Sequence, residues 1–141
     1  MIVATSTVHQ RFLPPEIRIL ICEYFLLRDW HANANMWPCW RFYHNDRAGA
    51  TIHHNGEATP ILPSEIVAVS PHTLIDRRLS NPVPHFYIHA TIGWPYHAYP
   101  QGVYRFHAPE WILELIDSVK GQCPRNAQIA TDPRRNIKIL A

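Results

Sequence analysis

The sequence predicts an α+β fold, in which an antiparallel sheet of about four to six short strands carries two main helices. Residues 14–28 and 109–120 have the length and apolar content of helices. Several shorter segments alternate apolar and polar residues, which is typical of strands with one buried face. Thirteen prolines in 141 residues keep each element short. We therefore expect residues 1–141 to form a single α+β domain that ends in a basic C-terminal tail.

The first predicted helix runs from about Pro14 to Arg28. Pro14 and Pro15 suit a helix start, and Glu16 in the first turn interacts favourably with the helix dipole. A helical projection places apolar residues on two nearly opposite sides, with Ile17, Leu20, Ile21 and Tyr24 on one and Ile19, Cys22 and Leu26 on the other. Such a helix must be covered on both sides, either by its own chain or by a partner on one of them. The run is too short for a membrane span, which needs about 20 residues.

Alternating segments predict strands at residues 36–44, 50–54, 57–62, 84–93 and 103–107, with further strands at 2–5 and 137–140. Asn55-Gly56 is a hairpin-turn signal between the second and third of these strands. We also expect 36–44 to pair with 50–54, and 84–93 with 103–107. In the 84–93 strand, Phe86, Ile88, Ala90 and Ile92 point to one face and His85, Tyr87, His89 and Thr91 to the other. Residues 64–70 and 73–79 are predicted as short helices or turns.

The second predicted helix covers residues 109–120 and ends before Gly121, a favourable C-terminal cap. Its apolar stripe contains Trp111, Ile112, Leu115, Ile116 and Val119. We expect Trp111 and Leu115 to anchor this helix in the core.

Two stretches of the first predicted helix carry a family resemblance. Leu13-Pro14-Pro15-Glu16-Ile17-Arg18 followed by Ile21-Cys22-Glu23-Tyr24-Phe25-Leu26 resembles the LPPEIRxxIYEYLL opening of fungal F-box-like proteins. Cys39-Trp40-Arg41 is similar to the end of the F-box. The resemblance implies an F-box-like N-terminal helix and a non-catalytic protein–protein interaction module, such as an adaptor or a subunit of a larger complex. Its partner would be a Skp-type adaptor protein or a second copy of the chain, bound through Leu13, Ile19, Cys22, Leu26 and Trp30.

Charge, cysteine spacing and the N-terminal residues indicate which partners and which cellular location to expect. A formal charge of +2 does not by itself indicate nucleic-acid binding. Cys22, Cys39 and Cys123 are widely spaced and include no paired motif, which favours a reducing compartment over a disulfide framework. The first ten residues lack the pattern of a secretory signal. We therefore expect an intracellular protein of the cytoplasm or nucleus, with no membrane association.

Ten histidines raise the question of a metal site. His85 and His89 lie four residues apart on a predicted strand and hence about 13 Å apart, whereas zinc ligands lie about 2 Å from the metal. We expect no metal and no cofactor. Cys123, a histidine and Asp132 could be drawn as a nucleophile triad, but no nucleophile elbow or glycine-rich loop accompanies them.

The segment from residue 85 to 107 supports an alternative function. It is rich in His, Tyr and Arg, and as a hairpin it would suit a small enzyme or an RNA-binding domain. The candidate aromatic and basic surface contains Trp94, Tyr96, Tyr99, Tyr104 and Arg105. The same residue types also dominate protein interfaces, so nucleic acid is the less favoured partner of this surface.

Overall fold

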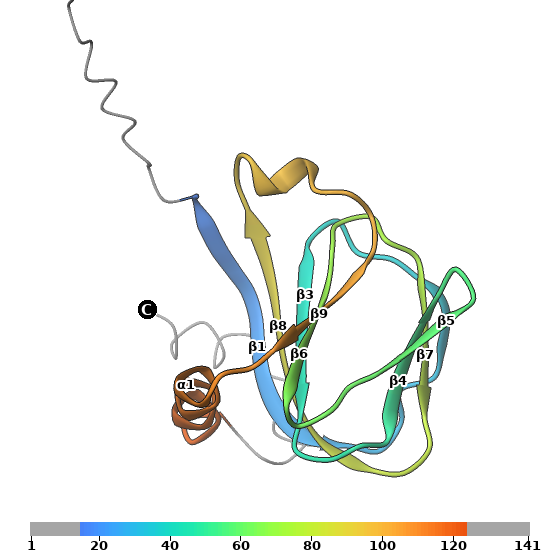
Figure 1. Ribbon diagram of the computed structural model, residues 1–141, viewed down its shortest axis with the longest axis vertical. Coiled ribbons are helices and arrows are strands. Elements are labelled where there is room, and N and C mark those ends of the chain that lie inside the picture. Colours follow the sequence, from blue (N-terminus) through green and yellow to red (C-terminus); the bar gives the residue numbers. More distant parts are fainter. Residues whose placement is uncertain (1–14, 124–141) are drawn as a thin grey trace, which may run out of the picture.

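The computed structural model describes residues 15–123, which form two facing antiparallel sheets with one α-helix outside them (Figure 1). The strands are β1 (Ile17–Leu27), β2 (Ala32–Asn35), β3 (Trp40–Asn45), β4 (Ala50–His54), β5 (Glu57–Pro60), β6 (Glu65–Val69), β7 (Ile75–Leu79), β8 (Val83–Ile92) and β9 (Val103–His107). The helix α1 spans Glu110–Lys120, and a 3-10 turn, η1, spans Tyr96–Ala98. Leu13, the strands predicted at 2–5 and 137–140, and the basic tail lie outside the described residues.

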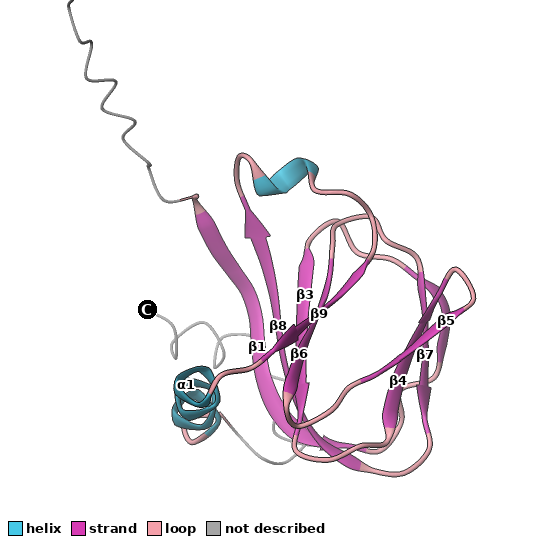
Figure 2. Cartoon of the chain, viewed as in Figure 1, coloured by secondary structure: helices cyan, strands magenta, loops and turns pink. Residues whose placement is uncertain are grey.

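The order of the strands is that of a jelly roll. One sheet has the order β1-β8-β3-β6-β9 and the other the order β2-β7-β4-β5. Successive strands from β1 to β8 therefore form a double-sheet Greek-key arrangement, closed by pairing of β1 with β8. Figure 2 shows the strands forming both layers and α1 lying beside the five-stranded sheet. No helix within residues 15–123 has the length and apolar character needed to cross a membrane.

The prediction of an α+β fold with two main helices is wrong, because residues 17–27 form a strand. β1 pairs with β8 along its whole length, from Ile17 opposite Ile92 to Leu27 opposite Val83. One face of β1 packs inside the sandwich and the other packs under α1. A strand that is covered on both faces reads as a continuous apolar run, and such a run imitates a buried helix.

Several smaller predictions were also wrong. Residues 65–69 and 75–79 are strands rather than helices or turns. The 36–44 segment contributes β3, which pairs with β6 and β8 and not with β4. The predicted 85–107 hairpin does not form, because β9 pairs with β6. These are long-range pairings of the jelly roll, and the sequence pattern of one strand does not reveal its neighbour.

Other local predictions were confirmed. β4 and β5 form a hairpin around Asn55 and Gly56, whose φ angles of 48° and 79° are those of a type I′ turn. Residues 103–107 form a strand, and the segments predicted at 84–93 and 109–120 form β8 and α1 with small shifts at their ends.

The anchors predicted for α1 are wrong, however. Trp111 is 65% exposed and Leu115 57% exposed, whereas Ile116 is 9% exposed. The helix is rotated so that Ile112, Ile116 and Val119 face the sheet. An ion pair accompanies this orientation: the buried Lys120 places Nζ 2.5 Å from Oδ1 of Asp46.

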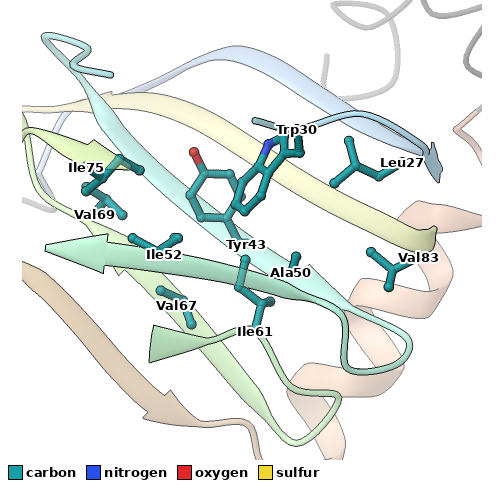
Figure 3. Packing of buried hydrophobic residues seen from close by; sticks show 10 residues of the cluster. All are labelled: Leu27, Trp30, Tyr43, Ala50, Ile52, Ile61, Val67, Val69, Ile75 and Val83. Atoms are coloured by element: carbon teal, nitrogen blue, oxygen red, sulfur yellow. The ribbon is translucent and has the colours of Figure 1, made fainter. Parts of the chain in front are cut away.

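Two apolar clusters stabilise the described fold. The first fills the space between the sheets and consists of Leu27, Trp30, Tyr43, Ala50, Ile52, Ile61, Val67, Val69, Ile75 and Val83 (Figure 3). The second lies between α1 and the five-stranded sheet and consists of the buried residues Cys22, Tyr24, Phe86, Ile116 and Cys123. The strands β1 and β8 therefore contribute side chains to a packed layer on each of their faces.

Candidate ligand-binding cavity

A half-open cavity of about 340 Å³ lies between the two sheets, next to the first apolar cluster, and its lining includes the exposed residues Asp29 and Trp37. Its walls come from both sheets and from the connection between β1 and β2. The lining residues are Ile21, Phe25, Leu27, Asp29, Trp30, Asn35, Trp37, Tyr43, Arg77, His85, Tyr87 and His89. Seven of these side chains carry aromatic or imidazole rings, so the cavity combines flat apolar surfaces with polar ring atoms.

The pairing of β3 with β8 positions much of this wall. Alternate residues of the two strands stand opposite one another and point between the sheets, as the pairs Arg41–His89, Tyr43–Tyr87 and Asn45–His85. The intervening residues, such as Phe42 and Ile88, point to the outer face. Because side chains alternate along a strand, the polar face of β8 is the inner face of the sandwich.

The two histidines of this wall are held as neutral rings. His85 is 1% exposed, and its Nδ1 lies 2.5 Å from Oδ1 of Asn45. Burial lowers the pKa of His85 to about 3, with a further contribution from the positive charge of Arg77. Burial likewise lowers the pKa of His89 to about 4, helped by the charge of Arg41 and Arg77. Both rings are therefore uncharged hydrogen-bonding groups at neutral pH.

The tyrosines of the wall are held as neutral phenols. The hydroxyl of Tyr87 donates to Oε2 of Glu23 at 2.6 Å, and burial followed by this carboxylate raises the pKa of Tyr87 well above its ordinary value. Burial also raises the pKa of Tyr43. The rings pack closely, with the centroids of Tyr43 and His85 5.5 Å apart and those of Trp30 and His85 5.2 Å apart.

Two arginines bring positive charge to this region. The Arg77 side chain lines the cavity, and its guanidinium carbon lies 5.3 Å from the centre of the Trp30 ring. Arg41 is fully buried behind the wall and donates from Nη1 to Oδ1 of Asn35 at 2.7 Å and from Nη2 to the Thr73 carbonyl at 2.8 Å. Burial lowers the pKa of Arg41, with Tyr43 and Cys39 opposing this shift and the charge of Arg77 adding a little to it.

The residues expected to bind a partner lie in different environments. Cys22 and Trp30 are buried, in the clusters on the outer and inner side of the sheet respectively. Ile19 packs against the cluster under α1, and Leu26 is half-buried. From Cys22 onward β1 is thus covered on both faces by this chain, whereas Ile17 and Leu20 are exposed. Binding of a partner through the predicted residues is not tested by the structure.

The expected aromatic and basic surface does come together in part. The ring centroids of Tyr99 and Tyr104 are 5.2 Å apart, and Tyr96 lies beside Tyr99 at 6.4 Å. Trp94 is 79% exposed. Arg105 forms a two-pronged ion pair with Glu65, with distances of 2.7 Å and 3.0 Å, so its charge is already compensated.

An apolar groove of about 390 Å³ adjoins these tyrosines on the outer face of the five-stranded sheet. We call it the outer groove. Its lining residues are Pro15, Ile17, Trp40, Phe42, Ala68, Ile92, Tyr96, Tyr99 and Phe106. Helix α1 covers another part of the same face.

The histidines are not grouped as metal ligands in the described part of the chain. Within residues 15–123, no three His, Cys, Asp or Glu side chains are arranged to hold a metal ion. The two histidines of the cavity wall alternate with aromatic residues on one strand and have Trp37, Tyr43 and Tyr87 as ring neighbours. The absence of a bound metal stays a prediction for elemental analysis.

Sequence reasoning missed the cavity. It considered His85 and His89 as metal ligands, which it rejected, and as part of a hairpin at residues 85–107, and it predicted a short helix or turn for residues 73–79, which contain Arg77. One signal was available: residues 40–45 and 85–89 both carry polar and aromatic residues on one face and apolar residues on the other. In a sandwich whose outer face is also covered, such a polar face can point inward.

The comparisons with known proteins bear on the fold. No protein-family model matches the sequence, and no curated protein matches it. Among solved structures, one of ToxT from Vibrio cholerae is 9% identical with a TM-score of 0.50, covering 86% of this chain and 51% of that chain. A second ToxT structure is 8% identical with a TM-score of 0.50, covering 87% of this chain and 54% of that one. This chain thus spans about half the length of the ToxT chains, and at this level of identity the likeness shows a similar fold alone.

Proposed function

We propose that this protein binds a small organic molecule in the cavity between its two sheets. The observation that carries the proposal is the wall of the cavity, where rings and neutral polar groups replace the aliphatic packing found elsewhere between the sheets. Ligand sites typically have volumes of about 300–1,000 Å³ and combine apolar surfaces with a few well-placed polar groups. A cavity of about 340 Å³ with this lining fits that description.

The pKa shifts favour binding over acid–base catalysis. A general base near neutral pH needs a pKa close to 7, whereas His85 and His89 have pKa values of about 3 and 4. Burial also raises the pKa of Cys22 to about 12, which keeps this thiol protonated. The two neutral imidazole rings are suited to fixed hydrogen bonds with a molecule bound in the cavity, whereas Cys22 lies outside the cavity, under α1.

A cavity-filling substitution tests the proposal. Ile21 lines the cavity, so Ile21→Trp should occupy the space that a ligand needs. Ile17→Trp is the matched control, because Ile17 lies on the same strand but lines the outer groove and is exposed. A chemical library would be screened by thermal shift on the wild-type protein, and each hit measured by calorimetry on both variants.

We expect at least one hit to lose about tenfold or more in affinity in Ile21→Trp and to bind Ile17→Trp as it binds the wild type. Hits that bind both variants equally would place the binding site elsewhere and remove the support for this function. Circular dichroism of each variant checks that the fold is retained.

We keep the protein-interaction function as a second proposal, because the outer groove favours it. The groove is apolar, Ile17 and Phe106 on its rim are exposed, and β9 beside it is an edge strand of the sheet. Exposed apolar patches of a few hundred Å² often mark protein contacts, and an edge strand can accept an extended peptide. The partner would then be an extended apolar segment of another protein.

A charge placed in the outer groove tests this second proposal. Phe106→Glu should abolish capture of a specific partner from the native source, while Trp111→Glu should not. Trp111 is the matched control, since it is an exposed aromatic residue on α1, away from the groove. A protein captured equally by both variants would contradict binding at this groove.

A further inference from the structure

We infer that the ligand of the cavity carries a carboxylate group, which pairs with the guanidinium of Arg77. This inference rests on the proposed ligand-binding function and names the chemical class of the ligand: an organic acid whose apolar body lies against the rings of the wall. Two positive charges support it, the fully buried guanidinium of Arg41 and the half-buried guanidinium of Arg77, and neither has a negative partner within residues 15–123.

Arg77 is the residue that presents its charge to the cavity. Its side chain lines the cavity and lies over Trp30. Its Nε is buried and has no hydrogen-bond partner. Among residues 15–123 no carboxylate forms an ion pair with this guanidinium. The ring of Trp30 lies against the guanidinium, and the terminal Nη groups, which make no hydrogen bond within residues 15–123, are the donors left for a ligand.

Arg41 adds a second charge behind the same wall. It is fully buried, its Nη1 and Nη2 are hydrogen-bonded to neutral oxygens, and its Nε has no partner. Asn35, which accepts from Nη1, itself lines the cavity. Arg41 also makes no ion pair with a described residue. Two guanidinium groups therefore place positive charge at one wall of the cavity.

Two carboxylates lie close to the cavity and do not neutralise these charges. Asp29 lines the cavity as an exposed residue at the β1–β2 connection. Glu23 accepts the hydroxyl proton of Tyr87 at the wall. Neither carboxylate forms an ion pair with Arg77 or Arg41. The histidines supply no negative charge, since both are neutral rings.

A bound carboxylate would resolve this imbalance. Burying a charge without a partner is costly, and a partner of opposite charge offsets that cost. The guanidinium matches a carboxylate through two parallel N–H···O bonds. The rest of the wall is aromatic, so the remainder of the ligand is expected to be apolar, and a flat ring or a short chain would pack on Trp37, Tyr43 and Phe25.

The test compares acids with neutral molecules of the same shape. The probes are a panel of arylalkanoic, indole-alkanoic and medium-chain alkanoic acids, each matched with its primary amide. Affinities are measured by calorimetry on the wild type, on Arg77→Met, and on Arg78→Met. Arg78 is the matched control, because it neighbours Arg77 on β7 but binds the Ala32 carbonyl and Asn33 and does not line the cavity.

We expect at least one acid to bind the wild type about tenfold or more tightly than its amide. That preference should disappear in Arg77→Met and persist in Arg78→Met. The comparison of acid with amide on the wild type remains decisive if Arg77→Met does not fold.

Two results would overturn the inference in different ways. If amides bind as tightly as acids, or if the preference for acids survives Arg77→Met, the carboxylate is refuted, while loss of binding in Ile21→Trp would still support a ligand cavity. If no probe binds at about 1 mM, or if binding is unchanged in Ile21→Trp, the carboxylate inference and the cavity function both fail.

Discussion

The orientation of α1 can be tested by a pair of substitutions at neighbouring positions. Ile116→Ala removes a side chain that packs between the helix and the five-stranded sheet, whereas Leu115→Ala removes one that is more than half exposed. Both changes leave an alanine, which favours the helical conformation. The difference between them therefore reports which face of the helix is buried.

The expected effect of Ile116→Ala follows from its surroundings. The lost apolar groups correspond to three methylene equivalents at about 0.8 kcal/mol each, or about 2.4 kcal/mol of transfer free energy. A space of about 200 Å³ lined by Phe42, Ile66, Phe86 and Ile112 already adjoins this side chain, so the added cavity term should be small. We expect a loss of about 2–3 kcal/mol, in the lower half of the range for such substitutions. Leu115→Ala should change the free energy of unfolding by less than about 0.5 kcal/mol.

Urea unfolding followed by far-UV circular dichroism gives both values, provided that the m-values of the variants agree. A loss in Leu115→Ala that equals or exceeds the loss in Ile116→Ala would refute this orientation of the helix and place Leu115 in the core.

Three further predictions concern the backbone, the pH dependence and the ion pair of the helix. Gly49→Ala should destabilise the fold by more than Gly56→Ala in urea melts, because a Cβ at Gly49 would lie 2.6 Å from a Val83 methyl group while a Cβ at Gly56 meets nothing within 4 Å. Both glycines have positive φ, so both substitutions strain the backbone. Equal losses of stability would mean that this backbone strain, and not the clash with Val83, sets the cost. The free energy of unfolding should fall as pH decreases from about 6.5 towards 4. Burial lowers the pKa of His85 to about 3 and that of His89 to about 4, so in this pH range only the unfolded chain takes up protons on these rings. Urea melts at several pH values check this, and a free energy of unfolding that does not change with pH would contradict the burial of the rings. Lys120→Met should cost about 1.5–3 kcal/mol, since it removes the cationic partner of a carboxylate that is 36% exposed and still accepts from Tyr24. A thermal melt close to that of the wild type would show that the ion pair is not required.

The sequence predicted local periodicity well where a strand has two different faces. In residues 84–93 the alternation of Phe86, Ile88 and Ala90 with His85 and His89 matches the observed faces of β8. The pattern could not indicate which face of β8 lies between the two sheets. Phe86 and Ile88 meet α1, and the histidines point between the sheets, because the five-stranded sheet has a helix on one side and a second sheet on the other.

The prediction of a helix for the residues of β1 was wrong for a related reason. The apolar residues of this strand fall on both faces, and from that distribution we expected cover on both sides, by the chain itself or by a partner; within this chain such cover is present from Cys22 to Leu27. The same distribution suits a helix of period 3.6 and a strand of period 2 when the segment is only 11 residues long. The three β-branched isoleucines at positions 17, 19 and 21 favoured the strand, but the proline pair before them imitated a helix start.

The candidate site could not be predicted from spacing. Arg41 and Arg77 lie on strands that are far apart in the sequence, and Arg77 and His85 lie on successive strands that belong to different sheets. When the sequence is considered alone, each residue has a local explanation: the arginines as charges on an edge strand, and the histidine as a solvated side chain. Their side chains meet because β3 and β8 pair in one sheet and β7 lies in the facing sheet. The jelly roll is completed by the long-range pairing of β1 with β8.

That pairing has a consequence for synthesis on the ribosome. Ile17 pairs with Ile92 and Leu27 with Val83, so β1 leaves the ribosome before its hydrogen-bonding partner has been made. At about 5–20 residues per second, the partner strand follows roughly 3–15 s later. During this interval an 11-residue segment rich in isoleucine and leucine has neither its ladder nor the helix that later covers it. We expect the nascent chain to depend on chaperones that hold extended apolar segments, and to be most vulnerable to aggregation before β8 has been translated.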